Sequence, residues 1–117
     1  MAQYLVLIYD SEAAWATASA ETRDGIRDGH ARFGAANGAA IVGGNALQPT
    51  GTATSLRPEA SGELAVTDGP FAETKEALGG FYLVEARDLD HAIEIAKLCP
   101  ARFGGVEVRP VMDVTGM

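Results

Sequence analysis

His30 is the residue of this sequence best suited to carry chemistry. An imidazole changes protonation near neutral pH, as a general acid or base requires. His30 follows Ile26 by four residues and precedes Phe33 by three, so the three side chains share one stripe of a predicted helix. Two interpretations stay open: an acid–base group held partly out of water, or a buried histidine whose nitrogens are satisfied by backbone or solvent.

Asp68 begins the second feature, the run Asp68-Gly69-Pro70-Phe71. Aspartate before Gly-Pro at a strand end is typical of a turn, because the carboxylate accepts a backbone N–H and glycine tolerates unusual dihedral angles. Strand ends also present carboxylates to ligands, and a carboxylate beside His30 would orient the imidazole. We therefore predict His30 and Asp68 as a candidate catalytic pair, with the turn as the structural alternative. The candidate pocket residues around the pair are Gly29, Phe33, Gly69, Pro70 and Phe71.

The remaining titratable candidates favour structural roles. His91 lies opposite the apolar stripe of its helix and is predicted to be solvated, as is the charged run 73–76. Cys99 is the single cysteine, so it forms no intramolecular disulfide and is predicted to be a small core residue rather than a reactive thiol. Arg109, near Glu107 on the last predicted strand, is either an anion-binding residue or, preferably, part of a salt bridge between two chains.

The sequence lacks several motifs that are typical of cofactor-binding proteins. The sequence has no phosphate-binding Gly-x-x-x-x-Gly-Lys loop, no Gly-x-Gly-x-x-Gly fingerprint, no nucleophile elbow and no Cys/His pairs at zinc spacing. With two histidines, a site of three histidines within one chain is impossible. We therefore expect no cofactor and no metal.

Composition restricts the class of protein further. The 117 residues amount to 12.2 kDa, which corresponds to a single domain over 1–117. A net charge of −7 disfavours nucleic acid and anionic membrane surfaces as partners. The N-terminal apolar run ending at Tyr9 is too short to span a membrane and lacks flanking positive charge, so we expect a strand there and a cytoplasmic protein.

The elements that must position these residues alternate between strands and helices. The run Asp10-Ser11-Glu12 is suited to cap a short helix, as are Ser19 and Asp88 to cap two further ones. The order β-α-β-(hairpin)-α-β predicts a ferredoxin-like α+β sandwich, an antiparallel sheet with two helices on one face. The predicted strands are 3–9, 39–42, 52–57, 63–67, 81–86 and 106–109, with a break or bulge at 43–44, a helical turn within 72–78, and a last helix whose apolar stripe is Leu89, Ala92, Ile93 and Ala96.

The predicted sheet leaves one face uncovered. Two helices cover a single face, yet the strands at 4–9 and 81–84 are apolar at successive positions and thus on both faces. A monomer would expose an apolar patch of a size that is rare on soluble monomers. We therefore predict that the open face packs against the same face of a second copy, as an isologous homodimer.

From Asp68 to Glu76, and on through Gly79-Gly80-Phe81-Tyr82, the sequence resembles the YCII-related family in its DGPF-motif branch. Further matching stretches follow in order over nearly the whole chain. They are 4–9, 12–15, 42–44, 47–49, 88–90 and 106–110. The resemblance implies a ferredoxin-like fold paired into a dimeric α/β barrel.

The same resemblance implies a site. A histidine and an aspartate form a dyad in a cleft of the wider family, where His30 corresponds to the first-helix histidine and Asp68 to the motif acid. Barrels of this architecture elsewhere host isomerases, monooxygenases and lyases. Members of the branch are also often encoded beside, or fused to, alternative sigma factors, which implies a regulatory association.

Two functional hypotheses from different classes result. In the first, the protein is a cofactor-independent enzyme, isomerase- or lyase-like, in which His30 transfers a proton on a small molecule and Asp68 orients it. In the second, it is a small-molecule sensor or partner-binding module in transcriptional regulation, and 68–71 is only a turn.

Overall fold

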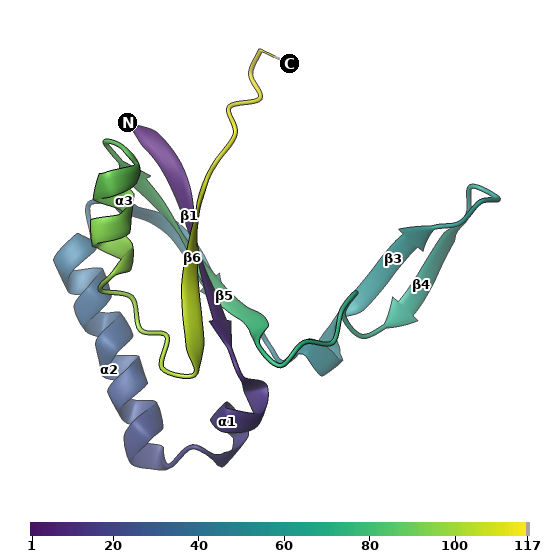
Figure 1. Ribbon diagram of the computed structural model, residues 1–117, viewed down its shortest axis with the longest axis horizontal. Coiled ribbons are helices and arrows are strands. Elements are labelled where there is room, and N and C mark those ends of the chain that lie inside the picture. The colour runs from purple at the N-terminus through teal and green to yellow at the C-terminus, as the bar shows by residue number, and fades with distance from the viewer. Residues whose placement is uncertain (117) are drawn as a thin grey trace.

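The computed structural model describes residues 1–116 and has two layers, with the long helices on one face of a four-stranded antiparallel sheet (Figure 1). The strand order is β2-β5-β1-β6, so the first strand lies at the centre beside the last. This arrangement confirms the predicted ferredoxin-like α+β fold. The sheet strands are β1 (Ala2–Asp10), β2 (Ile41–Ala46), β5 (Ala77–Ala86) and β6 (Gly104–Pro110).

Each helix begins at the cap that the sequence predicts, because a side-chain oxygen accepts one of the free N–H groups of the first turn. Ser11 accepts from Ala14 N–H, Ser19 from Thr22 N–H and Asp88 from His91 N–H. None of the helices described in residues 1–116 is both long and apolar enough to cross a lipid bilayer. The helices are α1 (Glu12–Thr17), α2 (Ala20–Asn37) and α3 (Leu89–Ala96).

The core lies between the sheet and the two longer helices. Tyr4, Val6 and Ile8 alternate along β1 and are buried toward the helices, as expected for a period of two. Phe33 of α2 is 1% exposed and Val84 of β5 is fully buried. The single helical layer therefore covers one face of the sheet only.

The structure moves the boundaries of all six predicted strands, most of all those of β2, β5 and β6. β2 begins at Ile41 rather than at residue 39 and runs on to Ala46, with the expected bulge where the register shifts between Ile41 and Gly43. The C-terminal strand extends over Gly104–Pro110 instead of 106–109. The predicted helical turn within 72–78 is wrong, because residues 71–76 form bends and coil and β5 already begins at Ala77. Pairing with β1 carries this strand past its Gly-Gly pair, with a register shift at Gly79, between the pairs Ile8–Gly80 and Tyr9–Leu78.

The apolar stripe predicted for the last helix is wrong in its phase. Leu89 and Ile93 are 47% and 36% exposed, whereas Ala92, Ile95 and Ala96 are buried. The buried row of α3 contacts the sheet through Ala92, Ile95 and Ala96, and Cys99 in the turn after the helix joins the same core. Packing of α3 against the sheet therefore buries the face that carries Ile95 and leaves the face that carries Leu89 in solvent.

A two-stranded hairpin stands apart from this body (Figure 1). β3 (Thr54–Pro58) and β4 (Leu64–Asp68) pair with each other and with no other strand in the described part of the chain. We call residues 54–68 the arm. The Cα radius of gyration is 16.6 Å, against about 13 Å for a compact chain of this length, because the arm projects from the sheet.

The glycines of α2 allow a test of the packing between α2 and Pro100. A Cβ at Gly29 would lie 2.8 Å from Cγ of Pro100, whereas a Cβ at Gly25 meets no atom within 4 Å. We expect Gly25→Ala to raise the free energy of unfolding by about 0.5–1 kcal/mol through helix propensity. Gly29→Ala should lower it, because overpacking costs about 1–3 kcal/mol and outweighs that gain. Urea denaturation measures both, and equal stabilisation of the two variants would contradict this packing.

Candidate functional site

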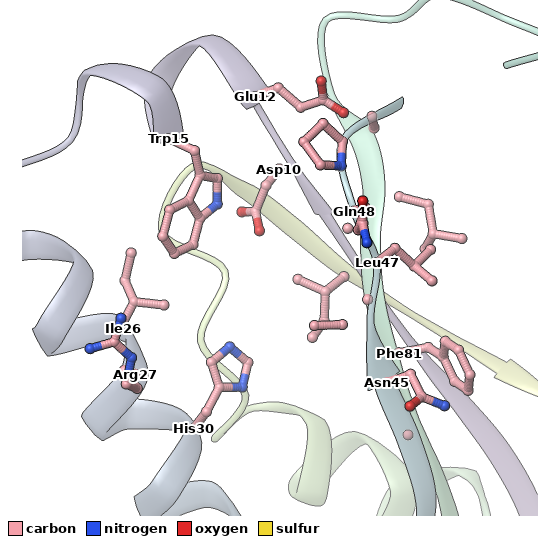
Figure 2. Close-up of a pocket in the computed structure, with 18 of the residues that line it drawn as sticks. Asp10, Glu12, Trp15, Ile26, Arg27, His30, Asn45, Leu47, Gln48 and Phe81 are labelled. Carbon is pink, nitrogen blue, oxygen red and sulfur yellow. The ribbon is translucent and has the colours of Figure 1, made fainter. Parts of the chain in front are cut away.

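A cavity lies at one end of the sheet, between α1, the N-terminal half of α2 and the adjoining ends of β1, β2 and β5 (Figure 2). Its volume is about 790 Å³, within the range of small-molecule sites. We call it the His30 pocket. Apolar side chains make up much of its wall, among them Ile8, Trp15, Ile26, Leu47 and Leu78.

His30 projects from α2 into this pocket and is held there by Tyr82 of β5. Its Nδ1 is 2.8 Å from the Tyr82 hydroxyl oxygen. The Tyr82 ring packs in turn on Phe33, with ring centroids 4.7 Å apart. Within residues 1–116 the other ring nitrogen, Nε2, forms no hydrogen bond. The packing therefore fixes the imidazole through Nδ1 and leaves Nε2 for a ligand.

The protonation states of the pair follow from its burial. Desolvation lowers the pKa of His30, and the negative charge of Asp10 opposes part of that shift. Desolvation raises the pKa of Tyr82, and the Cys99 thiol adds to the rise. At neutral pH the pair is thus a neutral imidazole beside a protonated phenol, which is the state a general base needs before it accepts a proton.

Asp10 is the carboxylate that the structure places with His30. It ends β1 and faces the pocket across from the His30 ring, beside Trp15 (Figure 2). From the sequence alone we interpreted Asp10 only as part of the capping run Asp10-Ser11-Glu12. The alternation of side chains along a strand could have identified Asp10 as a pocket residue from the sequence. Asp10 lies two residues beyond the buried Ile8 and therefore shares the face that the helices cover.

Short α1 forms one wall of the pocket and is fastened on two sides. The Glu12 carboxylate accepts hydrogen bonds from the N–H and the hydroxyl of Thr50, at 2.8 and 3.1 Å. Arg23 of α2 donates to the Trp15 carbonyl at 2.8 Å. The Trp15 ring also meets Phe103 edge to face, with centroids 5.7 Å apart. These contacts connect α1 to Thr50, to α2 and to Phe103.

His30 and Asp68 are not brought together within one chain. Asp68 is exposed at the end of β4, opposite Thr54, and lies outside the His30 pocket. Gly69 adopts a φ of +102°, its N–H donates to the Ala53 carbonyl at 2.7 Å, and its own carbonyl accepts from the Ser55 hydroxyl at 2.6 Å. In the isolated chain this segment therefore acts as the turn that closes the base of the arm.

The residues predicted to line a pocket with His30 and Asp68 also lie in two separate places. Gly29 and Phe33 line a second groove of about 930 Å³ beside Pro100. Pro70 and Phe71 lie at the base of the arm, where the Phe71 ring is 4.6 Å from the guanidinium carbon of Arg57. None of these four lines the His30 pocket.

The remaining candidates take structural places. His91 accepts a hydrogen bond from the Arg87 N–H at 3.0 Å, which supports the start of α3. Cys99 is buried, and desolvation, followed by the charge of Asp10, raises the pKa of its thiol to about 11, so the predicted core role is confirmed. The Arg109 guanidinium lies 2.6 Å from the Glu107 carboxylate of the same chain. A salt bridge from Arg109 to a second chain stays a prediction.

Fold and pocket together define a small ferredoxin-like α+β protein with a histidine–tyrosine site. The chain belongs to the YCII-related family, whose domain model matches residues 2–115. It is similar to an uncharacterized protein of Rhizobium meliloti (strain 1021), with 52% identity over 68 residues, which cover 56% of this chain and 54% of the relative. The chain thus spans about half, 54%, of the length of this curated relative.

The electrostatics of the pocket predict the titration of His30. Its midpoint should lie below the ordinary value of 6.5, because burial disfavours the imidazolium. In Asp10→Asn the midpoint should fall further, because the charge that opposes the shift is gone. NMR titration of the His30 ring protons measures both, and a midpoint above 6.5, or a rise in the Asp10 variant, would contradict this arrangement.

Stability should depend on pH through the same group. A folded-state pKa below the unfolded one means that protonation favours the unfolded chain, so wild type should lose stability relative to His30→Gln as the pH falls through 6.5. Above that pH the difference between the two free energies of unfolding should be constant. Urea denaturation at a series of pH values tests this, and a difference that stays flat into acid would refute it.

Proposed function

We propose that the protein is an enzyme that moves a proton on a small molecule bound in the His30 pocket, in an isomerase- or lyase-like reaction that uses the protein's own side chains. The observation that carries the proposal is the 2.8 Å contact between His30 Nδ1 and the Tyr82 hydroxyl inside a cavity, with Asp10 on the opposite wall. Convergent polar groups in an otherwise apolar pocket are the usual mark of such a site.

Each of the three groups has a defined part in the proposed reaction. With its hydrogen on Nδ1, His30 donates to the Tyr82 oxygen and presents Nε2 as the free base. Nε2 then takes a proton from a substrate carbon, and the Asp10 carboxylate stabilises the imidazolium that forms. In an isomerase the same proton returns to a different atom of the substrate. In a lyase the electron pair of the broken C–H bond forms a double bond and expels a leaving group, which takes the proton from His30.

The cavity also restricts the substrate class. Its wall includes Trp15, Ile26 and Leu78, which suits a compact aromatic or aliphatic body. A carbonyl beside the acidic C–H is the functional group that makes such a proton removable by a histidine. We therefore propose a small, largely apolar, carbonyl-bearing substrate.

The finer assignment to the DGPF-motif branch is also a proposal, supported by the run Asp68-Gly69-Pro70-Phe71. A second candidate function is a small-molecule sensor. It is favoured by Gly69, which closes the base of the arm and so gives the motif at 68–71 a structural role as a turn. In that case the His30 pocket binds a small molecule without turnover and the protein acts as a sensor, in the regulatory setting that the branch implies.

Solvent exchange tests the enzyme proposal without knowledge of the natural substrate. A panel of small aryl ketones, lactones and β-keto acids is incubated with the protein in deuterated buffer, and loss of the α-proton is followed by proton NMR. We expect exchange on at least one compound, a loss of about 100-fold or more in His30→Gln, and a loss of about tenfold in Tyr82→Phe, whose imidazole is no longer oriented.

His91→Gln is the matched control, because it removes the other histidine, which lies outside the pocket. Its exchange rate should equal that of wild type. Binding is measured in parallel by ligand-observed NMR. A compound that binds wild type and His30→Gln equally, with no exchange by either, would contradict the enzyme and support the sensor.

A further inference from the structure

Several charged side chains around the pocket already have partners in the protein. The Glu12 carboxylate accepts two hydrogen bonds from Thr50, and Arg27 forms a salt bridge with Asp24 of its own helix at 3.0 Å. The guanidinium of Arg23 donates to backbone carbonyls of α1. These three side chains therefore hold the wall of the pocket together.

Two polar groups on the wall opposite His30 form no hydrogen bond within residues 1–116. They are the Asp10 carboxylate and the indole N–H of Trp15. Figure 2 shows both side chains at the cavity, with the nitrogen edge of the indole turned toward the carboxylate. A carboxylate accepts hydrogen bonds and an indole N–H donates one, so the pocket offers a ligand an acceptor next to a donor.

The two amide side chains that border the cavity do not compete with this pair. Asn45 lies opposite Phe81 in the register of β2 and β5, and Phe81 alternates with the buried positions of β5. Its side chain therefore lies on the sheet face away from the helices. Gln48 is exposed in the coil after β2.

We propose that the substrate of the His30 pocket is an α-hydroxy carbonyl compound whose hydroxyl group lies between Asp10 and Trp15. A hydroxyl donates one hydrogen bond and accepts another, so it satisfies the carboxylate and the indole N–H together. A carbonyl oxygen would leave the carboxylate unpaired, and an ammonium group would leave the indole N–H unpaired. This inference rests on the proposed function and restricts its carbonyl-bearing substrate to one class.

The direction of the His30 ring places the reacting carbon next to that hydroxyl. Figure 2 shows Nε2 of His30 pointing toward the space in front of Asp10 and Trp15. A carbon within reach of Nε2 is therefore close to a hydroxyl that the pair binds. In an α-hydroxy carbonyl compound the carbon that carries the hydroxyl also adjoins the carbonyl, and it has the acidic C–H that the proposed reaction needs.

The reaction that follows is an exchange of the carbonyl and hydroxyl positions. His30 takes the proton of the C–H bond, whose electron pair forms a C=C bond to the carbonyl carbon, and the carbonyl oxygen becomes an enediolate oxygen. His30 then returns the proton to the former carbonyl carbon. The hydroxyl proton moves to the enediolate oxygen, and the oxygen that loses it becomes the new carbonyl.

The indole donor is fixed in place by contacts within the chain. The Trp15 ring meets Phe103 edge to face, with centroids 5.7 Å apart. The Trp15 carbonyl accepts from Arg23 at 2.8 Å. A donor that is already held in position loses little side-chain entropy when a ligand binds. Trp15 is thus suited to distinguish a hydroxyl from a group of equal size.

Three phenyl ketones of similar size test the need for the hydroxyl. α-Hydroxyacetophenone carries it, α-methoxyacetophenone keeps the oxygen but cannot donate, and propiophenone has a methyl group in its place. Exchange of the α-protons in deuterated buffer is followed by proton NMR and divided by the rate that free imidazole gives for each ketone. We expect wild type to prefer the hydroxy ketone by about tenfold or more over each of the others.

Two variants assign this preference to the two groups. In Asp10→Asn the preference over the methoxy ketone should fall by about threefold or more, because the charged acceptor is gone. Asp28→Asn removes the same charge from an exposed position outside the pocket and should keep the preference. In Trp15→Phe, which keeps an aromatic ring beside Phe103, the preference over propiophenone should fall by about threefold or more.

The indole gives a second readout that does not depend on the variants. Trp15 is the single tryptophan of the chain, so its N–H gives one NMR signal in ordinary water. The hydroxy ketone should shift this signal downfield, and propiophenone should not. Far-UV circular dichroism verifies that each variant keeps its fold.

The outcomes separate this inference from the proposed function. Exchange of all three ketones at equal corrected rates would overturn the inference and leave the enzyme in place. A preference that both variants retain would also overturn it. Preferential binding of the hydroxy ketone without exchange, measured by ligand-observed NMR, would contradict the enzyme and support recognition of the hydroxyl. Failure of the hydroxy ketone to bind would overturn the inference.

Discussion

The fold is governed by a central strand that is apolar on both faces. Tyr4, Val6 and Ile8 of β1 point to the helices, while Leu5 and Leu7 point the opposite way. Because the chain supplies only one helical layer, the first set makes the core and the second set stays uncovered. The position of the helices and the exposure of the second apolar row both depend on this division.

The His30 pocket lies where the rows of buried core residues on β5 and β1 end. On β5 the row that faces the helices passes from Val84 to Tyr82 and then to Gly80, so a packed hydrophobic position gives way first to a hydroxyl and then to no side chain. On β1 the corresponding row ends at Asp10. His30 enters from α2 at that level. Polar groups thus appear at the edge of the core, where desolvation shifts the pKa of His30 but solvent and ligand still reach the ring.

Much of this could be predicted from sequence, because it depends on local chemistry. Helix caps at Ser11, Ser19 and Asp88 involve residues a few positions apart, and the stripe of His30 follows from helical spacing. The partner of His30 could not be predicted, since Tyr82 lies 52 residues away and only the register of β5 brings it near. Turns and ligand sites are built from the same residue types, such as aspartate and glycine. The motif at 68–71 therefore suggested a site, although in the chain it forms a turn.

In the His30 pocket the imidazole Nδ1 lies against the Tyr82 hydroxyl, and we expect this ring to be neutral at pH 7 with Nε2 available as a base. Nitrogen-15 NMR of the histidine rings at pH 7 observes this state directly. We expect the hydrogen of the neutral His30 on Nδ1, and we expect Tyr82→Phe to remove this tautomer preference. An imidazolium at pH 7, or a tautomer ratio that Tyr82→Phe leaves unchanged, would contradict it.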